Sequence, residues 1–168
     1  MPLKIVTYPN PLLGKTSLPI TEVTDEIRRL ADEMTETMYK SDGIGIAAPQ
    51  VGKLVRLVII DISGPEKREG KMVLVNPVWT PLPDAGSIES EEGCLSVPGY
   101  WGYVKRPAWV KVRAHDRNGN EFETEGTGMT ARCFCHELAH LDGQLYTDLA
   151  DRIYTTEELD AMLEEQGK

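Results

Sequence analysis

The residues best suited to chemistry are two histidines four positions apart, with a glutamate directly after the first, in HELAH at 136–140. On an α-helix, residues four apart share one face, with Cβ atoms roughly 5–6 Å apart. The imidazoles of His136 and His140 can therefore converge on one divalent ion. Glu137 lies about 100° further round the helix, where it can act as a general base on water at that ion. The alternative is a buried helix whose histidines bond to backbone carbonyls, because so short a pattern also occurs by chance.

A catalytic metal normally has a third protein ligand, which HExxH does not supply. Cys133 and Cys135 lie on the same helix, where ligands on successive turns rarely surround an ion, so they are expected to be core residues. His115 falls in an expected strand and is predicted to lie at the surface. Cys94 is left, in EGCLS, and Gly93 before it would let the backbone approach another group closely. Considered alone, Cys94 could also be a packed or merely exposed thiol.

The composition resembles that of an ordinary globular chain and argues against several functional classes. A length of 168 residues predicts one domain, 1–168, large enough to bury a core without disulfides. A net charge of −9 disfavours nucleic-acid binding, which needs a basic face. The sequence has no apolar run of membrane-spanning length, and its start lacks the apolar stretch of a signal peptide. We therefore expect a cytoplasmic protein without membrane association, with its cysteines reduced.

Hydrophobic periodicity and turn residues predict helices within 24–43, 130–141 and 155–166. Runs rich in valine and isoleucine predict strands at 54–61, 71–77 and 108–116. Asn118-Gly119 is the strongest hairpin signal. The helix that carries HELAH has an apolar face and should be largely buried. Because the strands come in runs joined by hairpins, the pattern indicates an α+β domain.

Three separated motifs occur in the order GIGIAAPQ at 43–50, EGCLS at 92–96 and HELAH at 136–140. Together they resemble the signature motifs of the peptide deformylase family, enzymes that remove the formyl group from the N-terminal methionine of new bacterial proteins. The resemblance runs from IVTYPNPLL to HLDGQLYTDL, which is nearly the whole chain. It implies antiparallel β-sheets packed around a central helix that carries both histidines, with an N-terminal amphipathic helix and a short C-terminal helix.

The resemblance implies that Cys94, His136 and His140 are the ligands of one divalent ion per chain. In family members this ion is typically Fe²⁺ in the cell, and Zn²⁺, Ni²⁺ or Co²⁺ can occupy the same site. A thiolate and two imidazoles suit several of these ions, so the residue types do not choose among them. The ion lowers the pKa of its bound water, and the resulting hydroxide attacks the formyl carbonyl.

The same resemblance assigns the other catalytic roles. Glu137 takes the proton of the water and delivers it to the departing amine, so it is both general base and general acid. The Gln50 side-chain amide and the Leu95 backbone N–H donate hydrogen bonds to the tetrahedral oxyanion. The substrates implied are the formyl-methionyl N-termini of nascent polypeptides, the products are formate and a free N-terminus, and the enzyme is expected to be a monomer.

A substrate groove is implied as well, in which the main chain of GIGIAAPQ pairs with the peptide as an added strand. The methionine side chain would enter an apolar pocket near the motif helix. The substrate-binding residues implied in this way are Ile44, Gly45, Glu92, Gly93, Met129 and Cys133. The direction of the neighbouring Arg132 side chain stays open.

Two positions depart from the family pattern, with Ala139 in place of an aspartate and Cys135 where glutamine is common. Neither is an expected ligand or base, so the metal chemistry should remain. Arg106, twelve residues after Cys94, loses the aspartate with which the family's arginine can pair. Since a buried arginine without a partner is costly, Arg106 is expected to turn toward solvent or to find another carboxylate, with Asp142 the first candidate.

Other functions stay open from the residues alone. An HExxH metallopeptidase would cleave ordinary peptide bonds, but it would normally show a further histidine or glutamate ligand downstream. A divergent deformylase-like protein could act on another formylated substrate. A non-enzymatic metal-binding or interaction domain would need neither the base Glu137 nor the oxyanion donor Gln50.

Overall fold

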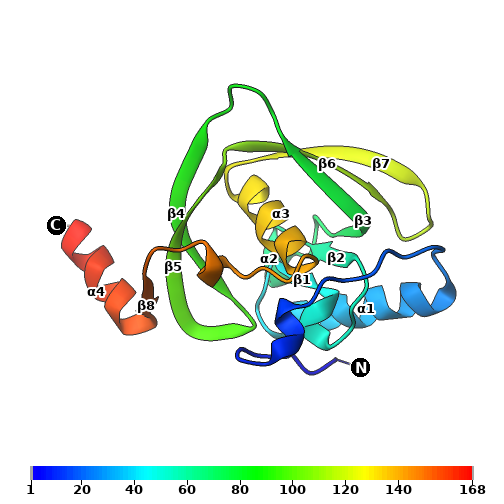
Figure 1. Ribbon diagram of the computed structural model, residues 1–168, viewed down its shortest axis with the longest axis horizontal. Helices are drawn as coiled ribbons and strands as arrows, with labels where there is room; N and C mark the ends of the chain where they lie inside the picture. Colours follow the sequence, from blue (N-terminus) through cyan, green and yellow to red (C-terminus); the bar gives the residue numbers. More distant parts are fainter. Residues whose placement is uncertain (1, 168) are drawn as a thin grey trace.

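Two antiparallel sheets enclose helix α3 (Gly128–His140) in the computed structural model, which describes residues 2–167 (Figure 1). The strand order is β1-β2-β3-β6-β7 in the larger sheet and β4-β5-β8 in the smaller one. The strands are β1 (Gly45–Ala47), β2 (Leu57–Ile60), β3 (Met72–Pro81), β4 (Ser87–Cys94), β5 (Val97–Pro107), β6 (Trp109–His115), β7 (Glu121–Thr127) and β8 (Ile153–Thr155). This confirms the predicted α+β class with a central helix. The end residues of the predicted domain, 1 and 168, lie outside the described part of the chain.

Helix α1 (Asp25–Lys40) is the predicted N-terminal amphipathic helix. Thr24 caps its start, since the Thr24 side chain accepts a hydrogen bond from the Ile27 N–H at 3.3 Å. Its buried residues include Met34 and Met38, which pack with apolar side chains of β1 and β2. The helix therefore supports the strand pair that begins the larger sheet.

Helix α3 begins two residues before the predicted 130 and ends one residue before 141. Ala131, Phe134 and Leu138 lie in the apolar core with strands of the larger sheet. On the other side, Arg132 donates to a carbonyl of β5. The helix is thus buried between the two sheets, as its apolar face predicted.

The long hairpin of β4 and β5 carries Cys94, and the sequence indicated only a short strand and turn there. Its segments SIESEEGC and VPGYWGYVKRP are rich in acidic residues, glycine and proline, which are depleted in strands. Pairing runs from Ser87 with Pro107 to Cys94 with Val97. Cys94 is therefore the last residue of β4, directly before a tight turn.

Two predicted strands have different limits in the structure. β3 continues beyond 71–77 to Pro81, because its pairing with β6 resumes at Val78 after a register shift near Asn76, whose φ is 50°. β2 is shorter than predicted, because residues 54 and 56 bond to the backbone of Leu18 instead. Both differences come from contacts with distant segments.

The hairpin between β6 and β7 confirms the Asn118-Gly119 signal. Gly119 has a φ of 85°, a value that favours glycine. The Asp116 N–H donates to the Asn120 carbonyl at 2.8 Å, and the Asp116 carboxylate accepts from the Asn118 N–H at 2.9 Å. This short turn returns the chain along β7 directly into α3.

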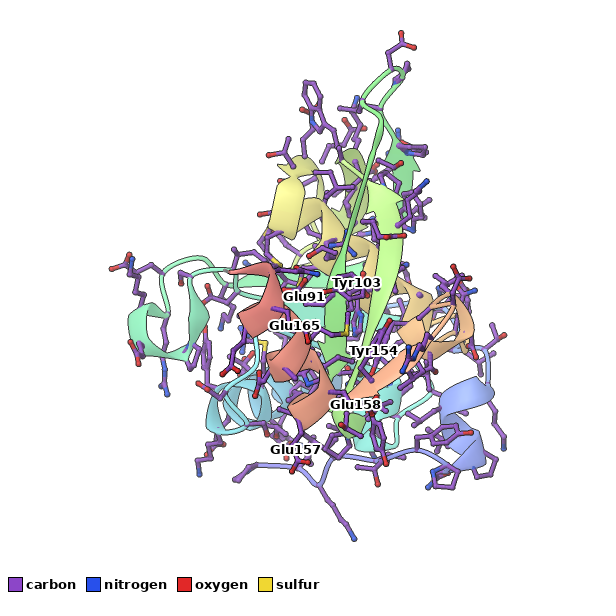
Figure 2. The ribbon with its side chains drawn as sticks, turned by 90° about the vertical axis from the view of Figure 1, so that its left-hand side faces the viewer. Glu91, Tyr103, Tyr154, Glu157, Glu158 and Glu165 are labelled. Atoms are coloured by element: carbon purple, nitrogen blue, oxygen red, sulfur yellow. The ribbon has the colours of Figure 1, made fainter. Side chains whose placement is uncertain are left out.

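The short C-terminal helix is α4 (Thr156–Gln166), and its predicted capping box joins Thr155 to Glu158. Figure 2 shows α4 beside β5 and β8, where Tyr103 and Tyr154 meet edge to face with ring centroids 6.1 Å apart. The remaining helical segments are α2 (Gly64–Lys67), η1 (Pro11–Gly14), η2 (Ala48–Val51) and η3 (Tyr146–Asp148). Within residues 2–167, no helix has both the length and the apolar character needed to cross a membrane.

Candidate metal centre and active site

The end of β4 and the second half of α3 bring three possible metal ligands together. The ligand atoms of Cys94, His136 and His140 all lie within 4.8 Å of one another, and the Cys94 sulfur is 3.4 Å from His140 Nε2. Among residues 2–167, no other group of three histidine, cysteine, aspartate or glutamate side chains is arranged in this way. The three residues that the resemblance named thus meet at one point.

The other thiols and the third histidine lie elsewhere. Cys133 and Cys135 are buried in the core, as predicted. Burial raises the pKa of both thiols, that of Cys135 to about 11, which disfavours the thiolate that a metal needs. His115 is half-buried on β6, not a fully exposed residue, and lines a separate cavity with Asn76 and Asn118.

The geometry and the donor types at this point fit a divalent ion. Ligand atoms no more than 4.8 Å apart suit an ion roughly 2.0–2.3 Å from each of them. Glu137 turns toward the same space, with Oε1 3.6 Å from His136 Nε2. Its other oxygen, Oε2, is buried and has no hydrogen-bond partner. An unpaired buried acceptor is costly. Glu137 Oε2 is therefore suited to contact a molecule, such as water, that binds among Cys94, His136 and His140.

The charges of the site favour a bound cation. Burial raises the pKa of Glu137 to about 7. Burial would lower the pKa of His136, but hydrogen bonds to Cys94 and Glu92 outweigh it and raise that pKa to about 10. Burial also lowers the pKa of His140, which keeps this imidazole neutral. The site therefore stabilises positive charge beside His136, and a metal ion competes with a proton for that place.

Glu92 holds the far side of the His136 ring. Its Oε1 lies 2.8 Å from His136 Nδ1, which leaves Nε2 on the side of the other ligands. Burial would raise the pKa of Glu92, but hydrogen bonds from Arg106 and His136 lower it to about 2, so the group is a carboxylate. Glu92 was predicted to bind substrate, but Arg106, Arg132 and His136 occupy both of its carboxylate oxygens.

Of the two outcomes predicted for Arg106, the structure shows the second, a pairing with another carboxylate, but the partner offered first, Asp142, was wrong. Arg106 is only 6% exposed, so it does not turn toward solvent. It does find another carboxylate, but this is Glu92, whose two oxygens accept from Arg106 Nε and Nη2 at 2.9 Å each. Asp142 instead pairs with Arg56 at 3.0 Å. The long β4–β5 hairpin explains the difference, because Arg106 pairs with Ile88 and Glu92 lies four residues further along β4 on the same face.

Gln50 and Leu95 lie next to Cys94. The Gln50 Oε1 accepts from the Ala47 N–H at 2.9 Å, which turns the amide nitrogen toward the Ser96 hydroxyl at 3.2 Å and the Cys94 sulfur at 3.5 Å. Leu95 follows Cys94 in the turn between β4 and β5. The two predicted oxyanion donors therefore lie beside one predicted ligand, Cys94, and their roles remain predictions.

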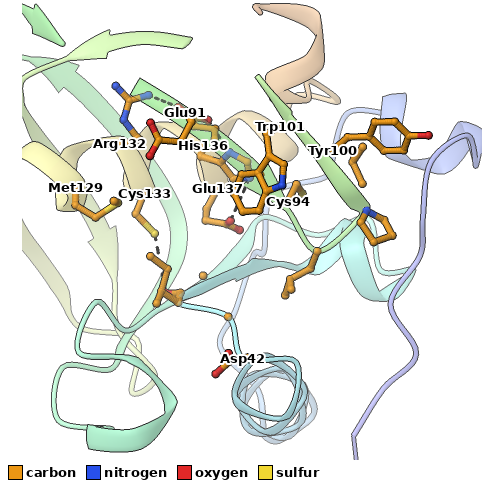
Figure 3. A pocket seen from close by; sticks show the side chains of 18 of the residues that line it. Asp42, Glu91, Cys94, Tyr100, Trp101, Met129, Arg132, Cys133, His136 and Glu137 are labelled. Atoms are coloured by element: carbon orange, nitrogen blue, oxygen red, sulfur yellow. Dashed lines mark hydrogen bonds and ion pairs between the residues drawn. The ribbon is translucent and has the colours of Figure 1, made fainter. Parts of the chain in front are cut away.

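A pocket of about 510 Å³ opens beside these residues. Figure 3 shows side chains of α3, among them Cys133 and Glu137, together with Cys94 and Trp101 of the β4–β5 hairpin around this pocket. All six residues predicted to bind substrate line it, namely Ile44, Gly45, Glu92, Gly93, Met129 and Cys133. The sequence had not singled out Trp101, Glu91 or Asp42, which line it too; no motif marked them.

Strand β1 borders this pocket and is an edge strand, since β2 is its neighbour in the sheet order. The Ile44 carbonyl accepts from the Asp61 N–H at 2.8 Å, on the β2 side. In an antiparallel ladder, main-chain groups alternate between the two sides of a strand. The polar groups of Gly45 are therefore expected on the open side, where an extended peptide could pair with them.

Comparisons with known proteins agree with this geometry. The family model for polypeptide deformylase matches residues 2–155. The chain belongs to the polypeptide deformylase family. It is 49% identical to the peptide deformylase of Agathobacter rectalis over 139 residues, which cover 83% of this chain and 84% of that one. It is 46% identical to the peptide deformylase of Caldicellulosiruptor bescii over 157 residues, 94% and 90% of the two chains.

A solved structure shares the fold. The crystal structure of peptide deformylase from Thermotoga maritima superposes with a TM-score of 0.83 at 33% identity, covering 90% of this chain and 99% of that chain. As a deformylase, the protein is a metal-dependent hydrolase that removes the formyl group from N-terminal formyl-methionine. The metallopeptidase and non-enzymatic alternatives have no support in these comparisons.

Proposed function

We propose that Cys94, His136 and His140 hold the catalytic ion and that Glu137 moves the proton of the hydrolytic water. The observation that carries this proposal is the convergence of the three ligand atoms within 4.8 Å of one another. When bound, a divalent ion supplies a Lewis acid that polarises the formyl carbonyl and makes water more acidic. The chain's own groups then complete the reaction.

Glu137 is the proton carrier. Its Oε2 is buried without a hydrogen-bond partner, so it can accept a proton from water in the pocket. A pKa raised by burial to about 7 suits a group that first takes and then returns a proton near neutral pH. The proton goes to the departing amine, and formate leaves.

Gln50 and the Leu95 N–H are the oxyanion donors. The side-chain oxygen of Gln50 accepts from the Ala47 N–H, and its side-chain nitrogen points toward Cys94. This donor therefore needs little reorganisation as negative charge develops on the formyl oxygen. Removing one such donor typically costs about 10²–10³ in rate.

The substrate main chain pairs with the open edge of β1 at Gly45, with Ile44 beside it, and the methionine side chain enters the pocket beside Met129 and Cys133. Main-chain pairing leaves the sequence after the first residue largely free, which suits enzymes that process many nascent chains. The ion in the cell is Fe²⁺, one per chain, and Zn²⁺, Ni²⁺ or Co²⁺ can replace it. Function as a cytoplasmic monomer stays a prediction.

The test is formate release from a formyl-methionyl peptide by anaerobically purified protein, with the metal content measured in the same sample. We expect about one ion per chain and one formate released for each peptide that is deformylated. The same peptide without its formyl group is the control, and cleavage of its internal bonds would support the metallopeptidase alternative. Protein that contains the ion but releases formate only from a different formylated compound would identify a divergent member.

A further inference from the structure

Arg132 has no role in the chemistry above, yet its guanidinium makes three hydrogen bonds beside the metal centre. Its Nη1 donates to Glu92 Oε2 and to the Val104 carbonyl, the latter at 2.8 Å. Its Nη2 donates to the Ile88 carbonyl at 2.6 Å. Ile88 belongs to β4, which ends in Cys94, and Val104 belongs to β5, so one side chain ties α3 to both strands of this hairpin.

Arg132 and His136 act on the same carboxylate from one face of α3. They are four residues apart, a spacing that places both side chains on one side of a helix. Glu92 Oε1 meets Arg106 Nη2 and His136 Nδ1, while Oε2 meets Arg106 Nε and Arg132 Nη1. Arg106 holds both oxygens from within the β4–β5 hairpin, so without Arg132 the Glu92–Arg106 pair would be tied to α3 through His136 alone.

Charge neutralisation does not explain this arrangement. Arg106 and Arg132 are each 6% exposed, and both pair with the single carboxylate of Glu92. One arginine would neutralise that carboxylate, and burying a second guanidinium adds a desolvation cost. The second arginine, Arg132, instead adds a geometric constraint. Its guanidinium binds two backbone carbonyls of the hairpin and Glu92 Oε2 at the same time, which fixes the position of that oxygen.

We propose that Arg132 is a positioning residue for the metal centre. It fixes Glu92 so that His136 donates its Nδ1–H to the carboxylate and presents Nε2 to the ion. The inference rests on the proposed role of His136 as a ligand. Partners of this kind, which hold a ligand without touching the ion, typically change metal affinity or activity by about 10–100-fold when removed.

The test measures Zn²⁺ affinity by competition with a chromogenic chelator for the native protein, Arg132→Leu, Glu92→Gln and the double variant. We expect Arg132→Leu to bind Zn²⁺ about 10–100-fold more weakly. If Arg132 acts through Glu92, the double variant should bind no more weakly than Glu92→Gln alone, since effects that share one path do not add.

Arg56→Leu is the matched control. Arg56 donates to the Leu141 carbonyl at 3.1 Å and to Asp142 at 3.0 Å, so it fastens the other end of α3 without reaching Glu92. Its removal should lower the denaturant midpoint of unfolding and leave Zn²⁺ affinity within about twofold, well short of the 10–100-fold loss expected above. Arg132→Lys keeps one charged donor near Glu92 and should restore part of the affinity. Arg132→Met, which keeps the apolar stem without a donor, replaces Arg132→Leu if that variant does not fold.

Two results would overturn the inference. One is native Zn²⁺ affinity in Arg132→Leu, or in Arg132→Met when that variant replaces it. The other is a further loss in the double variant equal to that of Arg132→Leu in the native background, which would show action independent of Glu92. Failure of the native protein itself to bind Zn²⁺ would instead contradict the proposed metal site.

Discussion

Three cysteines lie on or beside α3, but Cys94 is the one whose sulfur approaches a histidine nitrogen of the cluster, at 3.4 Å. We expect Cys94→Ser to lose the ion and roughly 10²-fold or more of the activity, since loss of a ligand should exceed the 10–100-fold effect of an outer partner. Cys133→Ser is the control and should retain the ion. Elemental analysis and formate release check both. If Cys133→Ser releases the ion and Cys94→Ser keeps it, the ligand assignment is wrong.

Glu137 separates ion binding from turnover. Glu137→Gln should keep one ion per chain and near-native stability, because the amide has the same shape, but it cannot accept the proton. We expect kcat to fall by about 10²–10⁴-fold. Glu91→Gln, which changes another carboxylate lining the same pocket, should keep most of the activity. Full activity in ion-loaded Glu137→Gln would rule out Glu137 as the base.

At the scale of elements, the contact between β1 and α3 sets the position of Glu137. A Cβ atom at Gly45 would lie 2.8 Å from Glu137 Cγ and 3.1 Å from the Cys133 sulfur. Pairing with β2 holds β1, and core packing holds α3. We expect Gly45→Ala to displace the Glu137 side chain and to lower kcat by about 10²-fold, the typical cost of a misplaced catalytic group, while the ion content is unchanged.

Gly14→Ala is the control for this substitution. No atom lies within 4 Å of a Cβ built at Gly14, so the activity should not change. Native kcat in Gly45→Ala would mean that β1 and α3 separate at no cost to catalysis, and the proposed contact would have no catalytic importance.

Asp61, in the loop after β2, leads to a prediction about how the stability of the protein depends on pH. Asp61 is fully buried and accepts from the Tyr39 hydroxyl, the Ser63 hydroxyl and the Gly70 N–H. Burial would raise the pKa of Asp61, but hydrogen bonds from Ser63 and Tyr39 lower it.

A carboxyl whose pKa is lowered in the folded state stabilises the protein above its unfolded pKa of about 3.9. This contribution disappears as the pH falls through the folded value. We expect Asp61→Asn to lower the free energy of unfolding at pH 7 by about 1–3 kcal/mol. Urea titrations from pH 7 downward should show that the gap between native and variant narrows in acid. A gap that widens in acid would contradict the prediction.

At the scale of the whole molecule, the ion would join the two sheets. Cys94 belongs to the smaller sheet, while the histidines lie on α3, which packs against the larger one. Since the ion binds the folded state, it should stabilise by about 2.7 kcal/mol when the free ion is at 100 times its Kd. Denaturant unfolding with and without a chelator measures this difference. The Cys94→Ser variant should show none, and an equal effect in that variant would place the ion elsewhere.

The sequence by itself determined the features that depend on neighbours along the chain. The amphipathic pattern predicted α1, and the Asn118-Gly119 turn predicted the β6–β7 hairpin. The capping box predicted that Thr155 caps the start of α4, and the spacing of His136 and His140 placed both on one helix face. Helix periods, caps and tight turns are set within a few residues, so a single sequence carries them. The three motifs in order also indicated the family.

Only the tertiary structure decided which distant groups meet. Glu92 is 14 residues from Arg106, 40 from Arg132 and 44 from His136, yet it contacts all three. The sequence left Arg132 open and offered Asp142 as a partner for Arg106, because nothing local distinguishes one carboxylate from another. The choice depends on how α3 packs against the β4–β5 hairpin and on the register of that hairpin. Both are set by burial of apolar surface over the whole core, far from the charged residues that they bring together.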